Sequence, residues 1–185
     1  VVNYAKSFLI SPEGKAVIEE RAIFTKGSKL FVGDFVDLQG DRFKTSSLDG
    51  NVFLLEIWGE GCSVCAGFHK KFEKELWPLL KDKEDFKVLS IFDGKSQDRW
   101  RKALDSKLYS CPEYINVSNL PLSSANHPFM KYYKVNYAPF FLLVDRQGKI
   151  ISNFRADVDF NYLLQLIELS LKEPRSLTMN NSHFK

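Results

Sequence analysis

Some stretches of this chain have a pattern of apolar and polar residues that is typical of strands, and others have a pattern that is typical of helices. Nearly continuous apolar runs predict strands that are covered on both faces. The predicted strands are 34–38, 42–44, 52–58, 86–92, 140–144 and 149–154. Apolar residues spaced three and four positions apart predict helices that bury one face. The predicted helices are 65–80, 97–107, 129–133 and 163–171.

This order of elements predicts the fold class. A strand, a helix, a strand and a helix, followed by a strand hairpin and a last helix, form an α/β sandwich around a mixed sheet. The stretch 109–123 is expected to be a loop, and 145–148 is expected to turn the chain between the last two strands. We therefore predict one main domain over 29–173.

Both ends of the chain differ from this domain. Residues 1–28 predict a hairpin followed by a connector, with a turn at 11–14. Because an isolated hairpin is marginal in water, this piece is expected to pack on the main domain or to be the remnant of an upstream domain. Residues 174–185 form a polar tail that is expected to fray.

The composition suits one ordinary domain with a sizeable core. The chain has 185 residues, of which 44% are apolar. Its 26 basic and 23 acidic residues leave a net charge of +3, which is too mild to indicate nucleic acid as a partner. No stretch approaches the ~20 apolar residues of a membrane-spanning helix. The chain begins at Val1 without methionine, so we expect a leader or anchor to be missing, and membrane contact only through that segment.

The candidate chemistry centres on Cys62-Ser63-Val64-Cys65, which follows the apolar run 52–58. Two cysteines separated by two residues can form an easily reduced disulfide. A strand before them and a helix after them place the first sulfur at a helix N-terminus, where free N–H groups and the helix dipole stabilise a thiolate. A thiolate is the species that attacks another disulfide. We predict Cys62 as the nucleophile, with a lowered pKa, and Cys65 as the resolving thiol.

Other interpretations of the cysteine pair give different chemistry. The pair could be buried and inert, or it could be half of a metal site, because His69 follows Cys65 by four residues. Structural zinc usually has four ligands, and the chain has no second Cys-x-x-Cys or histidine pair, so we expect no metal and no cofactor. Haem attachment is excluded because Ala66 stands where that motif requires histidine. Cys111 is predicted to be a spare thiol.

Glu56 is the one acidic residue in the apolar run 52–58, and it precedes Cys62 by six residues. A carboxylate is costly to bury, so at this position Glu56 is expected to be protonated or to have a partner. The alternative is that its side chain points outward to solvent from an edge strand.

These features together resemble the thioredoxin superfamily, and within it the extracytoplasmic TlpA/ResA-like branch. The similarity runs from about residue 33 to residue 171. It includes Trp58, at a position where the family usually has an aromatic residue, and 136–145, which is similar to the family's cis-proline segment and the strand after it. The resemblance implies a thioredoxin-like three-layer sandwich with a mixed central sheet, an N-terminal hairpin extension and a helical insertion over 95–135.

The resemblance also implies roles for individual residues. Glu56 matches the acid that shuttles the proton of the inner thiol in thioredoxins, so it is the expected general base for Cys65. Pro139 would follow a cis peptide bond and leave the backbone of Ala138 free to pair with an incoming peptide. The residues expected to contact the substrate or to shape its access are Trp58, Ser63, Val64 and Ala138.

The predicted function is thiol–disulfide exchange with protein thiols and disulfides. An upstream electron donor or acceptor is expected as a further partner. The resemblance implies an extracytoplasmic location, such as a periplasm, and we expect a reductase. Two other functions stay open here: a peroxiredoxin-like peroxidase, and a non-catalytic module that binds peptides beside Pro139. The segment 58–62 lacks the Pro-x-x-x-Thr-x-x-Cys pattern of the peroxidases, and a pure binder has no need of both cysteines.

Overall fold

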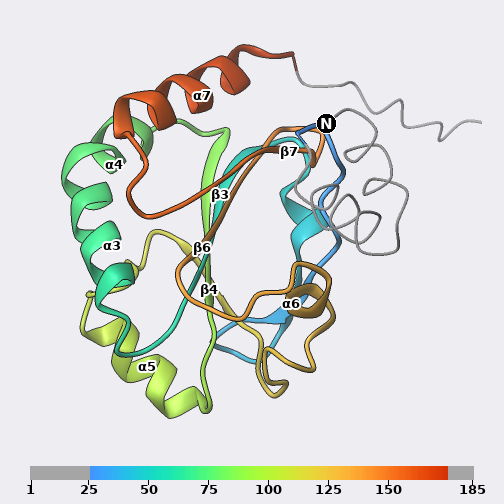
Figure 1. Cartoon of the computed structure of the whole chain (residues 1–185), viewed down its shortest axis with the longest axis vertical. Helices are drawn as coiled ribbons and strands as arrows, with labels where there is room; N and C mark the ends of the chain where they lie inside the picture. The colour runs from blue at the N-terminus through green and yellow to red at the C-terminus, as the bar shows by residue number, and fades with distance from the viewer. Residues whose placement is uncertain (1–25, 175–185) are drawn as a thin grey trace, which may run out of the picture.

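Seven strands form one mixed sheet through the centre of the molecule (Figure 1). The computed structural model describes residues 26–174, so the hairpin expected in 1–28, apart from its last three residues, and the tail expected after residue 174 lie outside the described residues. The strands are β1 (Asp34–Val36), β2 (Arg42–Lys44), β3 (Val52–Trp58), β4 (Phe86–Phe92), β5 (Ile115–Ser118), β6 (Phe140–Val144) and β7 (Ile150–Phe154). Their order across the sheet is β2-β1-β5-β4-β3-β6-β7.

Helices cover both faces of this sheet. They are α3 (Ser63–Glu75), α4 (Trp77–Leu80), α5 (Gln97–Asp105), α6 (Pro128–Tyr132) and α7 (Phe160–Lys172), with the 3-10 helix η1 (Thr45–Leu48) between β2 and β3. Figure 1 shows α3, α4 and α7 on one side of the sheet and α6 on the other. The α/β sandwich around a mixed sheet, and the hairpin β1–β2 before the first core strand, are therefore confirmed.

The central strand, β3, runs parallel to β4 and antiparallel to β6. All seven of its residues are buried, as its continuous apolar run predicts. Its odd-numbered residues pack in the layer that contains α6, and Val52 and Leu54 pack in the layer that contains α3 and α7. Because side chains alternate along a strand, Glu56 and Trp58 also face the side of α3.

The structure differs from the prediction at 115–118, which form β5 rather than part of a loop. This strand pairs in parallel with β4 and antiparallel with β1. It has only four residues, and two of them, Asn116 and Ser118, are polar, so its apolar signal is weak. The stretch 95–135 therefore holds α5 and α6, as the expected helical insertion, and also a strand that extends the sheet.

The helix predicted over 65–80 is divided in two. The first part, α3, begins at Ser63 and ends at Glu75, and α4 follows with Pro78 in its first turn. Proline has no N–H group and its ring clashes with the preceding turn, so one helix cannot continue through it. Leu79 falls on the outside of α4 and is exposed.

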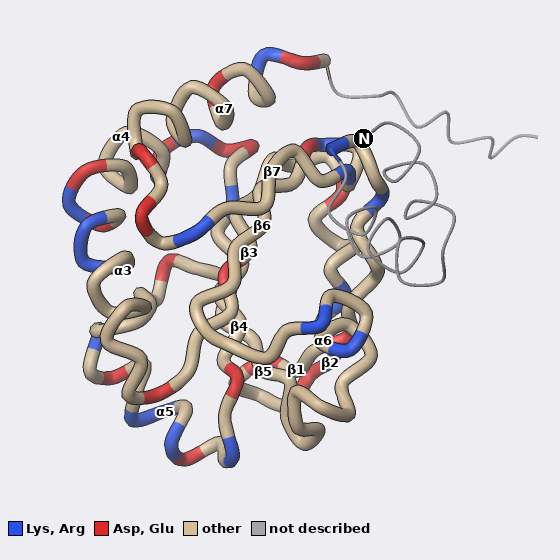
Figure 2. The backbone as a smooth tube through the Cα atoms, in the orientation of Figure 1, with Lys and Arg blue, Asp and Glu red and all other residues tan. Residues whose placement is uncertain are grey.

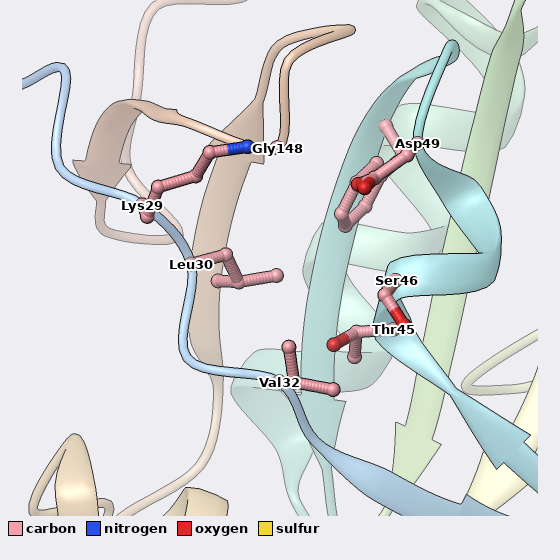
Figure 3. A pocket seen from close by; sticks show the side chains of 8 residues that line it. Lys29, Leu30, Val32, Thr45, Ser46, Asp49 and Gly148 are labelled. Atoms are coloured by element: carbon pink, nitrogen blue, oxygen red, sulfur yellow. The ribbon is translucent and has the colours of Figure 1, made fainter. Parts of the chain in front are cut away.

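The segment before β1 lies at the end of the sheet away from the cysteines. Lys29 forms an antiparallel bridge with Lys149 next to β7. Figure 3 shows the cavity of about 70 Å³ between this segment and the chain before β3, with labelled lining residues that include Lys29, Leu30, Val32, Thr45, Ser46 and Asp49. Phe53 also lines the cavity, near the start of β3. Cys62 follows the other end of that strand, so this cavity is separate from the candidate site.

Acidic and basic residues are interspersed over the surface of the molecule. Figure 2 shows both signs of charge along α3 and α5, and one exposed pair on α3 joins Lys71 to Glu75. Within the described range 26–174, none of the helices has the length and apolar character needed to cross a membrane.

Candidate active site around Cys62 and Cys65

Cys62 and Cys65 are joined by a disulfide at the start of α3. Their sulfur atoms are 2.02 Å apart and their Cα atoms are 5.3 Å apart. Cys62 is the N-cap residue of the helix, and the backbone N–H of Cys65 donates a hydrogen bond of 3.1 Å to its Sγ. The free N–H groups of the first turn and the positive end of the helix dipole favour a negatively charged sulfur at this place.

The two sulfurs differ in accessibility. Cys62 is partly exposed, whereas Cys65 is only 4% exposed. Ser63 and Val64, which lie between them, are exposed. A sulfur from outside the protein can therefore reach Cys62 and not Cys65.

The loop between β3 and α3 is held by residues from α5 and from the loop after it. Gly61 has a φ of +81°, a conformation that favours glycine. Its N–H donates to the hydroxyl of Tyr109 at 3.1 Å, and the ring of Tyr109 stacks on Trp58 with centroids 5.1 Å apart. Glu60 Oε2 lies 2.9 Å from Arg99 Nε. These contacts fix how the chain enters the N-terminus of α3.

Trp58 lies behind the disulfide and not at the surface. It is 1% exposed and packs in one cluster with Cys65, Phe92 and Trp100. Its Nε1 donates a hydrogen bond of 2.7 Å to Ser90 Oγ. A substrate cannot touch a side chain that is buried to this extent, so the expected contact between Trp58 and substrate does not fit its position. Trp58 instead supports Cys65 from inside.

Ala138 and Pro139 lie next to the cysteine motif. The peptide bond between them is cis, as the resemblance implies. Ala138 packs against the cluster that contains Cys65, so the fold brings these two parts of the predicted site together. The bond between Leu120 and Pro121 is also cis, and nothing in the sequence around it predicted this.

A groove of about 390 Å³ lies beside Pro139. Val64 of the cysteine motif and Ala138 line it, together with Phe140 and Phe141 of β6. Tyr137, which also lines the groove, is 70% exposed. The groove therefore offers the exposed ring of Tyr137 and the exposed side chain of Val64 beside the cysteine motif.

Glu56 lies in the middle of β3, opposite Ser90 of β4 and Phe141 of β6. It is 5% exposed, and its Oε1 is buried without a hydrogen-bond partner. Burial raises the pKa of Glu56 from 4.5 to about 8, with the Ser90 hydroxyl opposing this shift and Glu73 adding to it. The alternative of an outward side chain on an edge strand is wrong, because β3 is central and the carboxyl group is buried.

Further polar side chains lie buried near α3. His69 is 4% exposed, its Nδ1 is buried without a partner, and burial lowers its pKa. Tyr114, in the loop before β5, donates its hydroxyl hydrogen bond to Glu73 Oε1. Burial, together with this hydrogen bond, raises the pKa of Tyr114. The sequence marks His69 only by its spacing from Cys65, and no local pattern places Tyr114 beside it.

The other candidate chemistries have little support from the geometry. Among residues 26–174, no three or more His, Cys, Asp or Glu side chains are grouped so that they could hold a metal ion. Cys111 is a free and buried cysteine, and burial raises the pKa of its thiol, with Glu113 adding to the shift. A thiol of this kind is a weak nucleophile, in agreement with its predicted place as a spare.

A family model described as thioredoxin-like matches residues 50–150, which is more than half of the chain. The chain therefore belongs to the thioredoxin-like family. The matched range contains the central strand, the cysteine motif and Pro139, which are the parts that form the site.

Several solved structures with the same fold come from Bacteroides species. The thioredoxin domain of a thiol-disulfide oxidoreductase from Bacteroides vulgatus is 21% identical with a TM-score of 0.64, over 78% of this chain and 96% of that one. A thiol:disulfide interchange protein from Bacteroides sp. is 18% identical with a TM-score of 0.59, over 87% and 99%. A thioredoxin-like protein from Bacteroides caccae is 18% identical with a TM-score of 0.69, over 89% and 59%. At these identities the likeness shows the fold, and curated protein sequences gave no significant match.

Proposed function

We propose that this chain is a thiol–disulfide oxidoreductase that exchanges electrons with the thiols and disulfides of other proteins. The observation that carries the proposal is the disulfide between Cys62 and Cys65 at the N-terminus of α3, with only the outer sulfur accessible to a partner. When this disulfide is reduced, the helix N-terminus stabilises a thiolate on Cys62. That thiolate is the nucleophile of the reaction.

The exchange proceeds in two displacements. The Cys62 thiolate attacks one sulfur of a substrate disulfide, so a mixed disulfide forms and the other substrate sulfur leaves as a thiolate. Cys65 then loses its proton and attacks Cys62 Sγ, which re-forms the internal disulfide and releases the second substrate thiolate. Two electrons pass from the enzyme dithiol to the substrate, and an upstream dithiol returns them by the reverse steps.

Glu56 acts in this reaction as the proton acceptor for Cys65. Its carboxyl group is buried on the face of β3 that α3 covers, and α3 begins at the cysteine motif. Its pKa of about 8 is close to the ordinary pKa of a thiol, about 8.5. A proton can therefore pass between the two groups in either direction near neutral pH.

The groove beside Pro139 supports a polypeptide as the substrate. Val64 and Ala138 line the same groove, so a peptide that lies in it passes close to Cys62. The exposed ring of Tyr137 can contact its side chains. Hydrogen peroxide is too small to require such a groove, so the groove favours thiol–disulfide exchange over a peroxidase. The intact cysteine pair favours exchange over a peptide-binding module.

The finer assignment is a reductase of the extracytoplasmic TlpA/ResA-like branch. The hairpin β1–β2 before the first core strand and the insertion 95–135 support it, because both match that branch. Two solved structures of this fold are named for thiol–disulfide exchange, which supports the exchange reaction.

Insulin reduction tests the proposal. The wild-type chain, with dithiothreitol as donor, is expected to accelerate insulin precipitation, and Cys62→Ser is expected to abolish the acceleration. Peroxide consumption measured in parallel is expected to stay at background. Peroxide turnover without insulin reduction would support a peroxidase instead, and peptide binding without either activity would support a binding module.

A further inference from the structure

The turn that leads to Cys62 is rich in glycine. It runs from Trp58, the last residue of β3, to Cys62 at the start of α3, and two of the three residues between them are Gly59 and Gly61. Glycine has more conformational freedom than any other residue. A backbone hydrogen bond of 3.3 Å joins the N–H of Cys62 to the oxygen of Gly59. We expect the shape of this turn to depend also on contacts with other segments.

Tyr109 contacts both ends of the turn. Its ring stacks on Trp58, with centroids 5.1 Å apart and an angle of 7° between the planes. Its hydroxyl oxygen accepts a hydrogen bond of 3.1 Å from the N–H of Gly61, the residue before Cys62. Trp58 is 1% exposed, and its own N–H donates to Ser90. One side chain therefore connects the end of the turn beside Cys62 to a buried ring.

Arg99 makes a second contact with the turn, but a different one. Its Nε lies 2.9 Å from Glu60 Oε2, and the two side chains are 57% and 42% exposed. Exposed ion pairs contribute little to stability, and this one holds a side chain rather than the backbone. Tyr109 holds the backbone itself, and its ring is half-buried. We therefore expect Tyr109 to have the larger effect on the position of Cys62.

The position of Cys62 matters most after the disulfide has been reduced. In the oxidised chain the bond to Cys65 holds Cys62 at the N-terminus of α3. In the dithiol this bond is absent, so the sulfur stays at the helix N-terminus only as far as the turn keeps it there. At that place the N–H of Cys65, 3.1 Å from Cys62 Sγ, and the helix dipole stabilise the thiolate.

We propose that Tyr109 is a positioning residue that keeps the sulfur of Cys62 at the N-terminus of α3 when the disulfide is open. This inference rests on the exchange reaction proposed above. Tyr109 acts through the turn and takes no part in the bonds that form and break. It lies in the loop after α5, so the insertion 95–135 supports the nucleophile of the reaction.

Replacing Tyr109 by Phe tests this role without changing a charge. The ordinary pKa of tyrosine is about 10, so its side chain is neutral over the pH range of the test. The variant keeps Glu56 on β3, Glu60 in the turn and Arg99 with the other charged residues of α5. A change in the pKa of Cys62 then comes from the position of its sulfur and not from an altered charge.

Two further variants accompany this one. Tyr109→Phe removes the acceptor of the Gly61 N–H and keeps the ring on Trp58, whereas Tyr109→Leu removes both contacts. Tyr162→Phe is the matched control, because it removes the same hydroxyl group at an exposed position on α7. Thermal unfolding of each variant shows whether it is folded at the assay temperature.

The readout is the pH dependence of the alkylation of the reduced chain by iodoacetamide. Mass spectrometry with fragmentation distinguishes Cys62 from Cys65, and the midpoint of the profile gives the pKa of the Cys62 thiol. For the wild type we expect a midpoint below the ordinary value of about 8.5. For Tyr109→Phe we expect it to rise by about 0.5 pH unit, and for Tyr109→Leu by more.

A merely structural role gives a different result. It would lower the temperature of unfolding and leave the midpoint of the folded chain unchanged. Above the midpoint, the alkylation rate of Tyr109→Phe is expected to equal or exceed that of the wild type, because a thiolate of higher pKa is the better nucleophile. Tyr162→Phe is expected to match the wild type throughout.

The outcomes separate this inference from the proposed function. If the wild type reduces insulin and the folded Tyr109→Phe variant has an unchanged or lower midpoint, Tyr109 has no positioning role and the exchange reaction stands. A folded wild type that does not reduce insulin would overturn the proposed function, whatever the midpoints are. If Tyr109→Leu fails to fold, Tyr109→Phe decides the matter, because it removes only a hydroxyl group.

Discussion

Glu56 on β3 lies directly opposite Ser90 on β4, and the hydroxyl of the same Ser90 accepts the indole hydrogen bond of Trp58. The side chain of Ser90 therefore interacts with the buried acid and also holds the indole ring of Trp58, which packs against Cys65. The Ser90 hydroxyl lowers the pKa of Glu56, against the larger effect of burial. The arrangement keeps a buried carboxyl group on the face of β3 that α3 covers, with a pKa near the ordinary value of a thiol.

Replacing Glu56 by Gln should slow the second displacement. Glutamine has the same shape but cannot accept the proton of Cys65, so resolution of the mixed disulfide is expected to fall by about 100-fold or more at pH 7. Stopped-flow mixing of the reduced enzyme with a model disulfide measures this step. In the wild type the rate should rise as Glu56 ionises around pH 8. A Gln variant with the wild-type rate across this pH range would remove Glu56 from the mechanism.

The buried carboxyl group of Glu56 should make the free energy of unfolding depend on pH. Its pKa is 4.5 ordinarily and about 8 in the folded chain. Between these values the folded state holds more protons than the unfolded state, so the free energy of unfolding falls as pH rises from about 5 to 8. The loss is on the order of a few kcal/mol, at up to ~1.4 kcal/mol per pH unit.

Urea unfolding of the wild type and Glu56→Gln at pH 5, 7 and 9 measures this effect. The pKa values of His69 and His127 are lowered by burial, and below about pH 6.5 they change stability in the opposite direction. The contribution of these histidines cancels when the free energies of unfolding of the wild type and the variant are subtracted. If the stability of the wild type relative to Glu56→Gln does not fall as pH rises, the carboxyl group is not buried as described. Glu75→Gln should track the wild type.

Replacing Ser90 by Ala should weaken the site in two ways. The buried indole N–H of Trp58 loses its acceptor, at a cost of about 1–3 kcal/mol. The pKa of Glu56 should rise further, because the hydroxyl that lowers it is gone. Urea unfolding and the pH profile of the resolution step measure the two effects. Ser152→Ala is the matched control, since that hydroxyl makes only a 3.5 Å contact on β7, and equal behaviour of both variants would contradict the assigned role of Ser90.

Replacing Cys65 by Ser should trap the substrate. Cys62 can still attack, but the resolving thiol is absent, so the mixed disulfide is expected to accumulate. Mass spectrometry after mixing with a disulfide-containing protein detects the adduct, and tryptic peptides locate it. Cys111→Ser should form no lasting adduct, because both active cysteines remain. An adduct on Cys111 and not on Cys62 would contradict the assignment of the nucleophile.

The sequence was most informative where the fold buries a strand on both faces. The bounds predicted for 52–58, 86–92 and 140–144 agree with β3, β4 and β6, because continuous apolar runs have one stable place, inside the sheet. The same reasoning left two environments open for Glu56, and the structure shows the buried one. The strand β5 was not predicted because its apolar and polar residues alternate over only four positions, 115–118. Its extended conformation depends on pairing with the edge of β4.

The site was predictable only where its parts are local or belong to a known family pattern. The cysteine motif and its helix are contiguous in sequence, and Pro139 came from the resemblance. The contacts of Tyr109 with Gly61 and of Tyr114 with Glu73 join residues 48 and 41 positions apart. No periodicity marks such pairs, so they required the three-dimensional structure.

The redox equilibrium of the Cys62–Cys65 pair shows whether this pair exchanges electrons with other dithiols. The folded chain is incubated in dithiothreitol or glutathione buffers of known potential, and the free thiols are counted by alkylation and mass spectrometry. We expect one reversible two-electron transition, with a potential near that of thioredoxin at about −270 mV for a reductase. A potential near the roughly −120 mV of a strong oxidant would contradict the reductase direction. A pair that is reduced only when the chain unfolds would contradict thiol–disulfide exchange altogether.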